Sequence, residues 1–95
     1  MAGPPPLGHP VKPLPTFDRR FGRKTPAQRA KVEATLRLLA EDPRHPGLHT
    51  HKVEGYGGVF ESYVDDSMRV TWEWEQGGGI LLRNTCQHDP VLRNP

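Results

Sequence analysis

Arg69 and His88 are the residues of this chain whose types and spacing best suit chemistry on a phosphate group. Arg69 lies near the start of a strand-like segment, residues 68–75, and His88 directly follows a second one, residues 80–87. The glycine-rich stretch 76–79 predicts a hairpin, so the two strands should pair antiparallel. This pairing places the start of one strand beside the end of the other. The sequence therefore predicts a guanidinium and an imidazole close together on a water-accessible rim, an arrangement suited to phosphodiester chemistry.

The helices expected to support this sheet come first in the chain. Thr25 is a good N-cap, Pro26 suits the first helical position, and Gln28 completes a capping box, which predicts a helix over Pro26–Glu41. A shorter helix is expected over residues 18–23, with Thr16 as its cap.

Alternation with a period of two predicts strands over residues 59–64, 68–75 and 80–87. Residues 48–54 form a loop or an edge strand, and residues 10–15 could add another strand at an edge. Trp72 and Trp74 alternate with Val70, which favours the core over exposed base-stacking positions. The expected fold class is α+β, with two N-terminal helices packed on a three- to four-stranded antiparallel sheet.

Composition limits the chain to one small domain. It has 95 residues, 34% of them hydrophobic, and six of its eleven prolines lie in the first sixteen positions. We therefore expect residues 1–15 to be a proline-rich arm, extended or disordered, and residues 16–95 to form one domain. The single cysteine, Cys86, excludes an intramolecular disulfide and fits a reducing compartment. No apolar run approaches the ~20 residues that span a bilayer, so we expect a cytoplasmic protein without a membrane partner.

The charge is unevenly distributed. Residues 1–24 carry five basic residues and one acidic residue, which leaves eight basic and ten acidic residues for the rest of the chain. Sequence-independent binding to nucleic acid rests on many contacts between basic groups and phosphates. The numbers therefore do not predict tight RNA binding by the chain alone.

The histidines and the cysteine do not predict a metal site. The candidate ligands are His45, His49, His51, Cys86 and His88, but no paired Cys-x-x-Cys motif supports them. The stretches 55–58 and 77–79 lack the strand–loop–helix context of a phosphate cradle and are expected to be turns. We predict no metal and no cofactor.

The order of these segments resembles a known family, the RelE/ParE toxin superfamily of bacterial toxin–antitoxin systems. The matching pieces lie between residues 17 and 89 and follow in this order: Phe17 with the basic stretch to Lys24, the helix Pro26–Glu41 ending in Asp42-Pro43, Pro46-Gly47-Leu48, His51-Lys52-Val53-Glu54-Gly55, strand 59–64, Arg69-Val70-Thr71-Trp72, and His88-Asp89.

The resemblance implies the α+β fold and two possible activities. RelE-type members are implied to cut messenger RNA in the ribosomal decoding site without a metal, and ParE-type members to poison DNA gyrase. Both types are implied to be silenced by an antitoxin segment that wraps the toxin.

The resemblance also implies roles for individual residues. Arg69 matches the arginine that grips the scissile phosphate. His88 falls where relatives place an arginine or histidine that acts as an acid, and His51 and Lys52 lie in a segment that supplies basic or catalytic groups in some relatives. The chain departs from the family in two places. Leu92 is the nearest candidate for the aromatic residue that many relatives carry beyond the histidine position, and strand 59–64 lacks the lysines of some nucleases.

Metal-free cleavage of RNA uses the 2′-hydroxyl as nucleophile and needs a base, an acid and positive donors for the phosphate oxygens. Glu61 is a candidate base if it shares the face of Arg69. On spacing alone, Arg69 could instead be a solvated arginine that pairs with Glu61 or Glu73. The predicted catalytic residues are Arg69, His88 and Glu61. The predicted RNA-binding residues are Lys52, His51, Arg83, Arg19, Arg20, Arg23 and Lys24.

The function expected from these residues and the resemblance is a ribosome-dependent mRNA endonuclease toxin. Its partners would be a cognate antitoxin, the ribosome and messenger RNA. The alternatives are a non-catalytic ParE-like toxin that binds DNA gyrase and a regulatory binding domain of the same fold.

Overall fold

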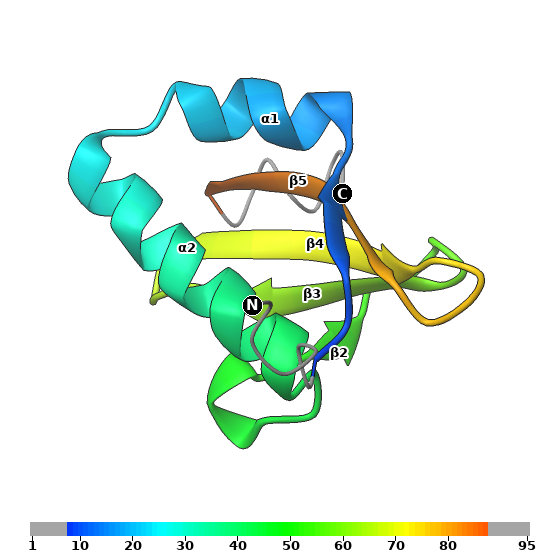
Figure 1. The fold of residues 1–95 in the computed structure, drawn as a ribbon. Helices are drawn as coiled ribbons and strands as arrows, with labels where there is room; N and C mark the ends of the chain where they lie inside the picture. Colours follow the sequence, from blue (N-terminus) through cyan, green and yellow to red (C-terminus); the bar gives the residue numbers. More distant parts are fainter. Residues whose placement is uncertain (1–7, 88–95) are drawn as a thin grey trace, which may run out of the picture.

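The structure, a computed structural model, describes residues 8–87, and in this range two helices pack on a five-stranded sheet (Figure 1). The order of strands across the sheet is β1-β5-β4-β3-β2. β1 and β5 are parallel, and the other neighbours are antiparallel. The elements are β1 (Val11–Pro13), α1 (Pro15–Gly22), α2 (Pro26–Glu41), the 3-10 turn η1 (Pro46–Leu48), β2 (His51–Lys52), β3 (Val59–Tyr63), β4 (Met68–Trp74) and β5 (Ile80–Gln87).

The α+β class is confirmed, while the strand count of three to four was too low. The additional strands are short edge strands. β2 has two residues, and β1 lies within the stretch 10–15 that the sequence allowed as an edge strand. The part of the predicted arm before residue 8 lies outside the described residues.

The two helices begin differently. The Thr25 hydroxyl accepts a hydrogen bond from the Gln28 backbone N–H, and the Gln28 side chain accepts one from the Thr25 N–H, which confirms the predicted capping box. The predicted cap of α1 was wrong. Leu14 occupies the N-cap without a side-chain hydrogen bond, and Thr16 lies inside the first turn. Pro15, whose backbone angle is already helical, begins the helix, so the N-cap lies two residues before Thr16.

The core lies between the helices and one face of the sheet. Val70, Trp72 and Leu82 meet Val32 and Leu39 there, and all five side chains are almost fully buried. Trp72 is thus a core residue, as its spacing predicts. Trp74 was predicted for the core as well and is 43% exposed. It is the last residue of β4, where its ring contacts Trp72 and His9 edge-on at the end of the sheet.

A bulge in β5 determines which residues share a face of the sheet. Trp72 pairs with Leu82 and Thr71 with Asn84, so Arg83 is the extra residue on its strand. Beyond the bulge, Asn84 and Cys86 stand opposite Thr71 and Arg69. Such a register shift cannot be read from alternation, which assumes an uninterrupted ladder. No helix within residues 8–87 has the length and apolar character needed to cross a membrane.

Candidate active site

Glu61 and Arg69 form a buried pair on the face of the sheet that points away from the helices. Glu61 is on β3 and Arg69 on β4, and alternation turns both side chains opposite to Val70 and Trp72. Nε of Arg69 lies 3.6 Å from Oε1 of Glu61. Glu61 therefore shares the face of Arg69. The sequence analysis required this for Glu61 to be a candidate base.

Burial distinguishes this pair from the surface arrangement that the sequence suggested. Arg69 is 5% exposed and Glu61 0%. Arg69 is therefore neither the solvated arginine of the alternative interpretation nor a fully water-accessible one. Charges are buried at a high desolvation cost, so they are retained where they are paired.

Three contacts besides the one to Glu61 hold the guanidinium of Arg69 in place. Its Nη1 donates to the backbone carbonyl oxygens of Asp65, at 2.6 Å, and Met68, at 3.1 Å. Its Cζ lies 3.5 Å from the centroid of the Tyr63 ring, a cation–π contact, and Nε faces Glu61. Within residues 8–87, Nη2 makes no hydrogen bond, so this nitrogen can donate to a phosphate oxygen.

Tyr63 is a site residue that the sequence analysis did not predict. It stands directly opposite Arg69 in the β3–β4 register and two residues after Glu61. That two-residue spacing was the available signal, because it places Tyr63 on the face of Glu61 and Arg69.

His51 joins the cluster from β2. Its Nε2 lies 3.2 Å from Oε1 of Glu61, and its Nδ1 lies 3.1 Å from the carbonyl oxygen of His49. The His51 side chain is 51% exposed, so it connects the buried carboxylate with the solvent.

Asp65 organises the turn that positions Arg69. Its Oδ1 accepts hydrogen bonds from the backbone N–H groups of Met68, at 2.7 Å, and Ser67, at 2.9 Å. The bond from Met68 is the largest cause that lowers the pKa of Asp65 below its ordinary value. The Ser67 N–H and Lys31 add to it, and burial opposes it.

The other predicted RNA-binding residues do not gather at this cluster. Arg83 forms an ion pair with Glu73. Lys52 is exposed and stands opposite Phe60, so alternation points it to the other face of the sheet from His51. His88 lies outside the described residues.

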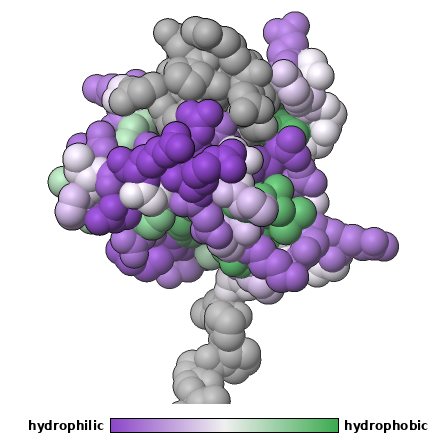
Figure 2. All heavy atoms as spheres, turned by 90° about the horizontal axis from the view of Figure 1, so that it is seen from above, coloured by the Kyte–Doolittle hydropathy of each residue, from purple (hydrophilic) through white to green (hydrophobic). Residues whose placement is uncertain are grey.

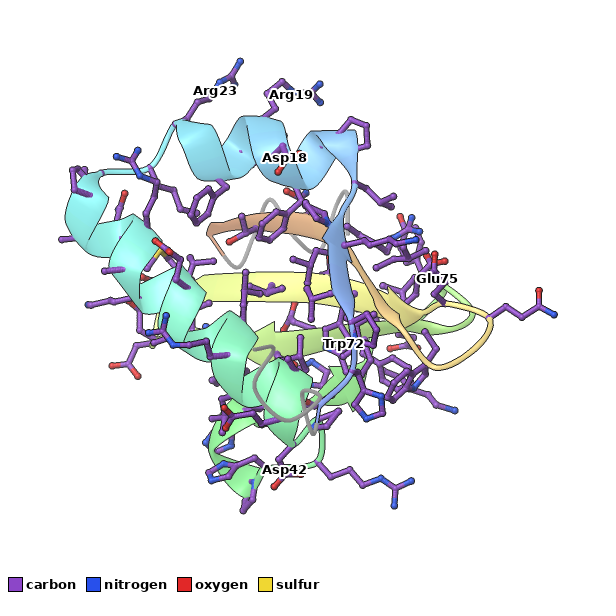
Figure 3. All side chains as sticks on the ribbon, viewed as in Figure 1. Asp18, Arg19, Arg23, Asp42, Trp72 and Glu75 are labelled. Carbon is purple, nitrogen blue, oxygen red and sulfur yellow. The ribbon has the colours of Figure 1, made fainter. Side chains whose placement is uncertain are left out.

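The basic residues of the first helix form a separate region. Arg19 and Arg23 extend from α1 away from the sheet (Figure 3), and this face of the molecule is strongly hydrophilic (Figure 2). Arg20 is half-buried in α1. Lys24 follows the helix, and its Nζ lies 3.7 Å from the Met68 sulfur. The Arg19–Lys24 stretch is therefore a second surface, distinct from the Glu61–Arg69 cluster.

Within residues 8–87, no three histidine, cysteine, aspartate or glutamate residues come close enough to hold a metal ion. His45, His49 and His51 lie in this range, whereas His88 does not.

The fold is shared with several solved structures, although no family model and no curated protein sequence matches the chain. The toxin–antitoxin complex DinJ–YafQ of Escherichia coli matches with a TM-score of 0.72 and 10% identity, over 90% of this chain and 98% of that one. The archaeal RelE–RelB complex of Pyrococcus horikoshii matches with 0.69 and 15% identity, over 85% and 96%. A YoeB/ParE toxin of Agrobacterium tumefaciens matches with 0.70 and 12% identity, over 83% and 98%.

These matches extend over nearly the full length of the compared chains and most of this one. At such low identities they show the fold alone, and they confirm the resemblance at that level. This chain has the fold of the RelE-like toxins of toxin–antitoxin systems.

Proposed function

We propose that this chain is the toxin of a toxin–antitoxin pair and that it cleaves messenger RNA on the ribosome. The observation that carries this proposal is the cluster of Glu61, Arg69, Tyr63 and His51 on the face of the sheet that points away from the helices. Surface arginines are common, but an arginine that is buried, stacked and tied to two carbonyl oxygens is held in one orientation. Because the Arg69 guanidinium is already oriented, it needs little reorganisation when negative charge develops on a phosphate.

In the proposed reaction the 2′-hydroxyl of the RNA attacks the adjacent phosphorus, and the bond to the departing 5′-oxygen breaks. Arg69 donates from Nη2 to a phosphate oxygen. Glu61 accepts the proton of the 2′-hydroxyl, and His88 gives a proton to the departing oxygen. Since Glu61 is buried and His51 contacts it from the solvent side, the His51 ring must turn away for the hydroxyl to reach the carboxylate.

The proposed partners follow from the charge distribution and the fold. The chain carries a net charge of +2, which is too small for tight binding to RNA. The ribosome would therefore position the substrate. Arg19, Arg20, Arg23 and Lys24 would contact ribosomal or messenger phosphates from the α1 surface, with Lys52 and Arg83 as further contacts. Two of the similar structures are complexes with antitoxins, which supports a cognate antitoxin as the inhibitor.

Binding to DNA gyrase is the second candidate function. One of the similar structures is described as a YoeB/ParE toxin, and most donors of Arg69 are engaged within the protein, as a structural role would require.

Inducible expression in bacteria tests the proposal against this alternative. Growth arrest with cleaved transcripts supports the nuclease, and arrest with induction of the DNA-damage response supports the gyrase-binding toxin. Normal growth at a verified protein level contradicts both and leaves a regulatory binding domain.

A further inference from the structure

A pocket with basic residues in its wall lies outside the cluster described above. It opens where α2 ends and the chain turns toward β2, near Asp42 in Figure 3, and its volume is about 330 Å³. This volume is at the lower end of the range of small-molecule sites, about 300–1,000 Å³. Its lining residues are Pro43, Arg44, His45, Pro46, His49 and Thr50. Three of these six side chains can carry positive charge, and none is acidic.

His45 is oriented as a donor. Its Nδ1 accepts a hydrogen bond from the backbone N–H of Gly47, at 2.9 Å. The proton of the neutral ring is therefore on Nε2, which is left to donate to a ligand.

His49 ends the 3-10 turn η1 in a left-handed backbone conformation. Its φ of 47° lies in the left-handed region, and it is the only residue other than glycine with a positive φ among residues 8–87. Histidine is among the residues other than glycine that adopt this conformation most often, and here it caps the end of η1. The ring packs against Tyr63 with centroids 5.1 Å apart, and its nitrogens make no hydrogen bond within the described part of the chain.

Thr50 is anchored to the core. Its hydroxyl lies 2.7 Å from the Ser62 hydroxyl, which in turn accepts a hydrogen bond from the Trp72 indole N–H at 2.9 Å. The nearest carboxylate in sequence, Asp42, accepts a hydrogen bond from the backbone N–H of Arg44 at 3.2 Å. The pocket thus has one wall that is fixed to the core through Thr50. No acidic residue in its lining neutralises its basic side chains.

We propose that this pocket binds a phosphate group of an RNA chain. A guanidinium and two imidazoles that line one pocket, with no carboxylate among the lining residues, suit a phosphate oxyanion. The pocket lies near the Glu61–Arg69 cluster, because Tyr63 contacts both the ring of the lining residue His49 and the Arg69 guanidinium. An RNA with its scissile phosphate at Arg69 would therefore place a neighbouring phosphate here. The choice of RNA as the source of the phosphate rests on the proposed function.

The test is a binding titration of the full chain, which does not depend on catalysis. The ligands are inorganic phosphate and a short RNA oligonucleotide with 2′-O-methyl groups, which cannot be cleaved through the 2′-oxygen. The imidazole resonances of His45 and His49 are followed by NMR. We expect both to shift with both ligands, and Arg44→Gln to weaken oligonucleotide binding about tenfold.

Two further variants make the test specific. His49→Asn removes the imidazole and keeps a residue that tolerates the left-handed conformation, and we expect it to weaken oligonucleotide binding about fivefold. Arg37→Gln removes the same charge as Arg44→Gln from the exposed surface of α2, and we expect a change of less than twofold. Equal losses in Arg44→Gln and Arg37→Gln would indicate only net charge and overturn the proposal.

The remaining outcomes separate the possible ligands and the two proposals. Histidine shifts with inorganic phosphate but none with the oligonucleotide would assign the pocket to a free anion and overturn the RNA source. The absence of shifts with either ligand would overturn the site itself. Specific oligonucleotide binding by a chain that cleaves nothing on ribosomes would support the pocket and contradict the proposed function.

Discussion

The guanidinium of Arg69 lies over the aromatic ring of Tyr63, its Cζ 3.5 Å from the ring centroid. The two residues stand opposite each other on β3 and β4, so the sheet itself sets their separation. The ring supports one side of the guanidinium, while the carbonyl oxygens of Asp65 and Met68 bind its Nη1. Arg69 is thereby oriented before any substrate arrives.

Tyr63→Leu should lower the rate of ribosome-dependent cleavage about tenfold with little change in KM. The variant removes a partly desolvated cation–π contact, worth about 1–2 kcal/mol, and frees the guanidinium to move. Tyr63→Phe keeps the ring and should retain most of the activity. Steady-state kinetics of the two variants checks this, and equal losses of rate would point to the hydroxyl group instead.

Glu61→Gln should destabilise the fold by about 3 kcal/mol, because it leaves the charge of Arg69 buried with no carboxylate beside it. The matched control is Glu73→Gln on the same sheet face, where the partner Arg83 is about a third exposed. That variant should cost less than about 1 kcal/mol. Urea denaturation of both variants measures the difference, and similar losses would contradict the distinction between the two pairs.

Thr25→Ala should destabilise the protein by about 1 kcal/mol, because it removes one half of the capping box of α2. Thr16→Ala is the control. Thr16 was the cap expected from sequence for the first helix, but it lies inside that helix and makes no capping bond. We expect a change of a few tenths of a kcal/mol in its unfolding free energy. A loss as large as that of Thr25→Ala would restore Thr16 as a cap.

Acid should destabilise the turn that holds Arg69. The pKa of Asp65 is lower in the folded protein than its ordinary value, so the ionised carboxylate stabilises the fold above about pH 4. That contribution is lost as the pH falls through the lowered pKa. Asp65→Asn should therefore flatten the decline of unfolding free energy below about pH 4. Asp66→Asn, a change at the exposed neighbouring residue, should leave the decline as it is.

Local signals in the sequence predicted much of the fold. The capping box at Thr25 and Gln28 involves residues three positions apart, and the glycines after β4 mark a tight hairpin. Both need only neighbouring residues to form, so their residue types are sufficient evidence. The pairing of β1 with β5 joins Val11 to Ile80, and no local signal specified it.

Alternation along the strands gives the face of a side chain but not its environment. The sequence left open whether Glu61 shares the face of Arg69, which the β3–β4 register decides, and it does not specify how deeply that face is buried. It also did not reveal that Nε2 of His51 contacts Glu61, because this contact depends on the pairing of the two-residue strand β2 with β3. The role of Arg83 was obscured by the bulge in β5, where it pairs with Glu73.

Cleavage of messenger RNA by the purified chain on programmed ribosomes tests the central claim most directly. Wild type, Arg69→Gln and the surface control Arg37→Gln are compared, with the folded state of each verified by circular dichroism. We predict cuts within the translated message for wild type and the control, and a loss of at least a hundredfold for Arg69→Gln. Undiminished cleavage by a folded Arg69→Gln variant, or no cleavage by wild type, would contradict the account.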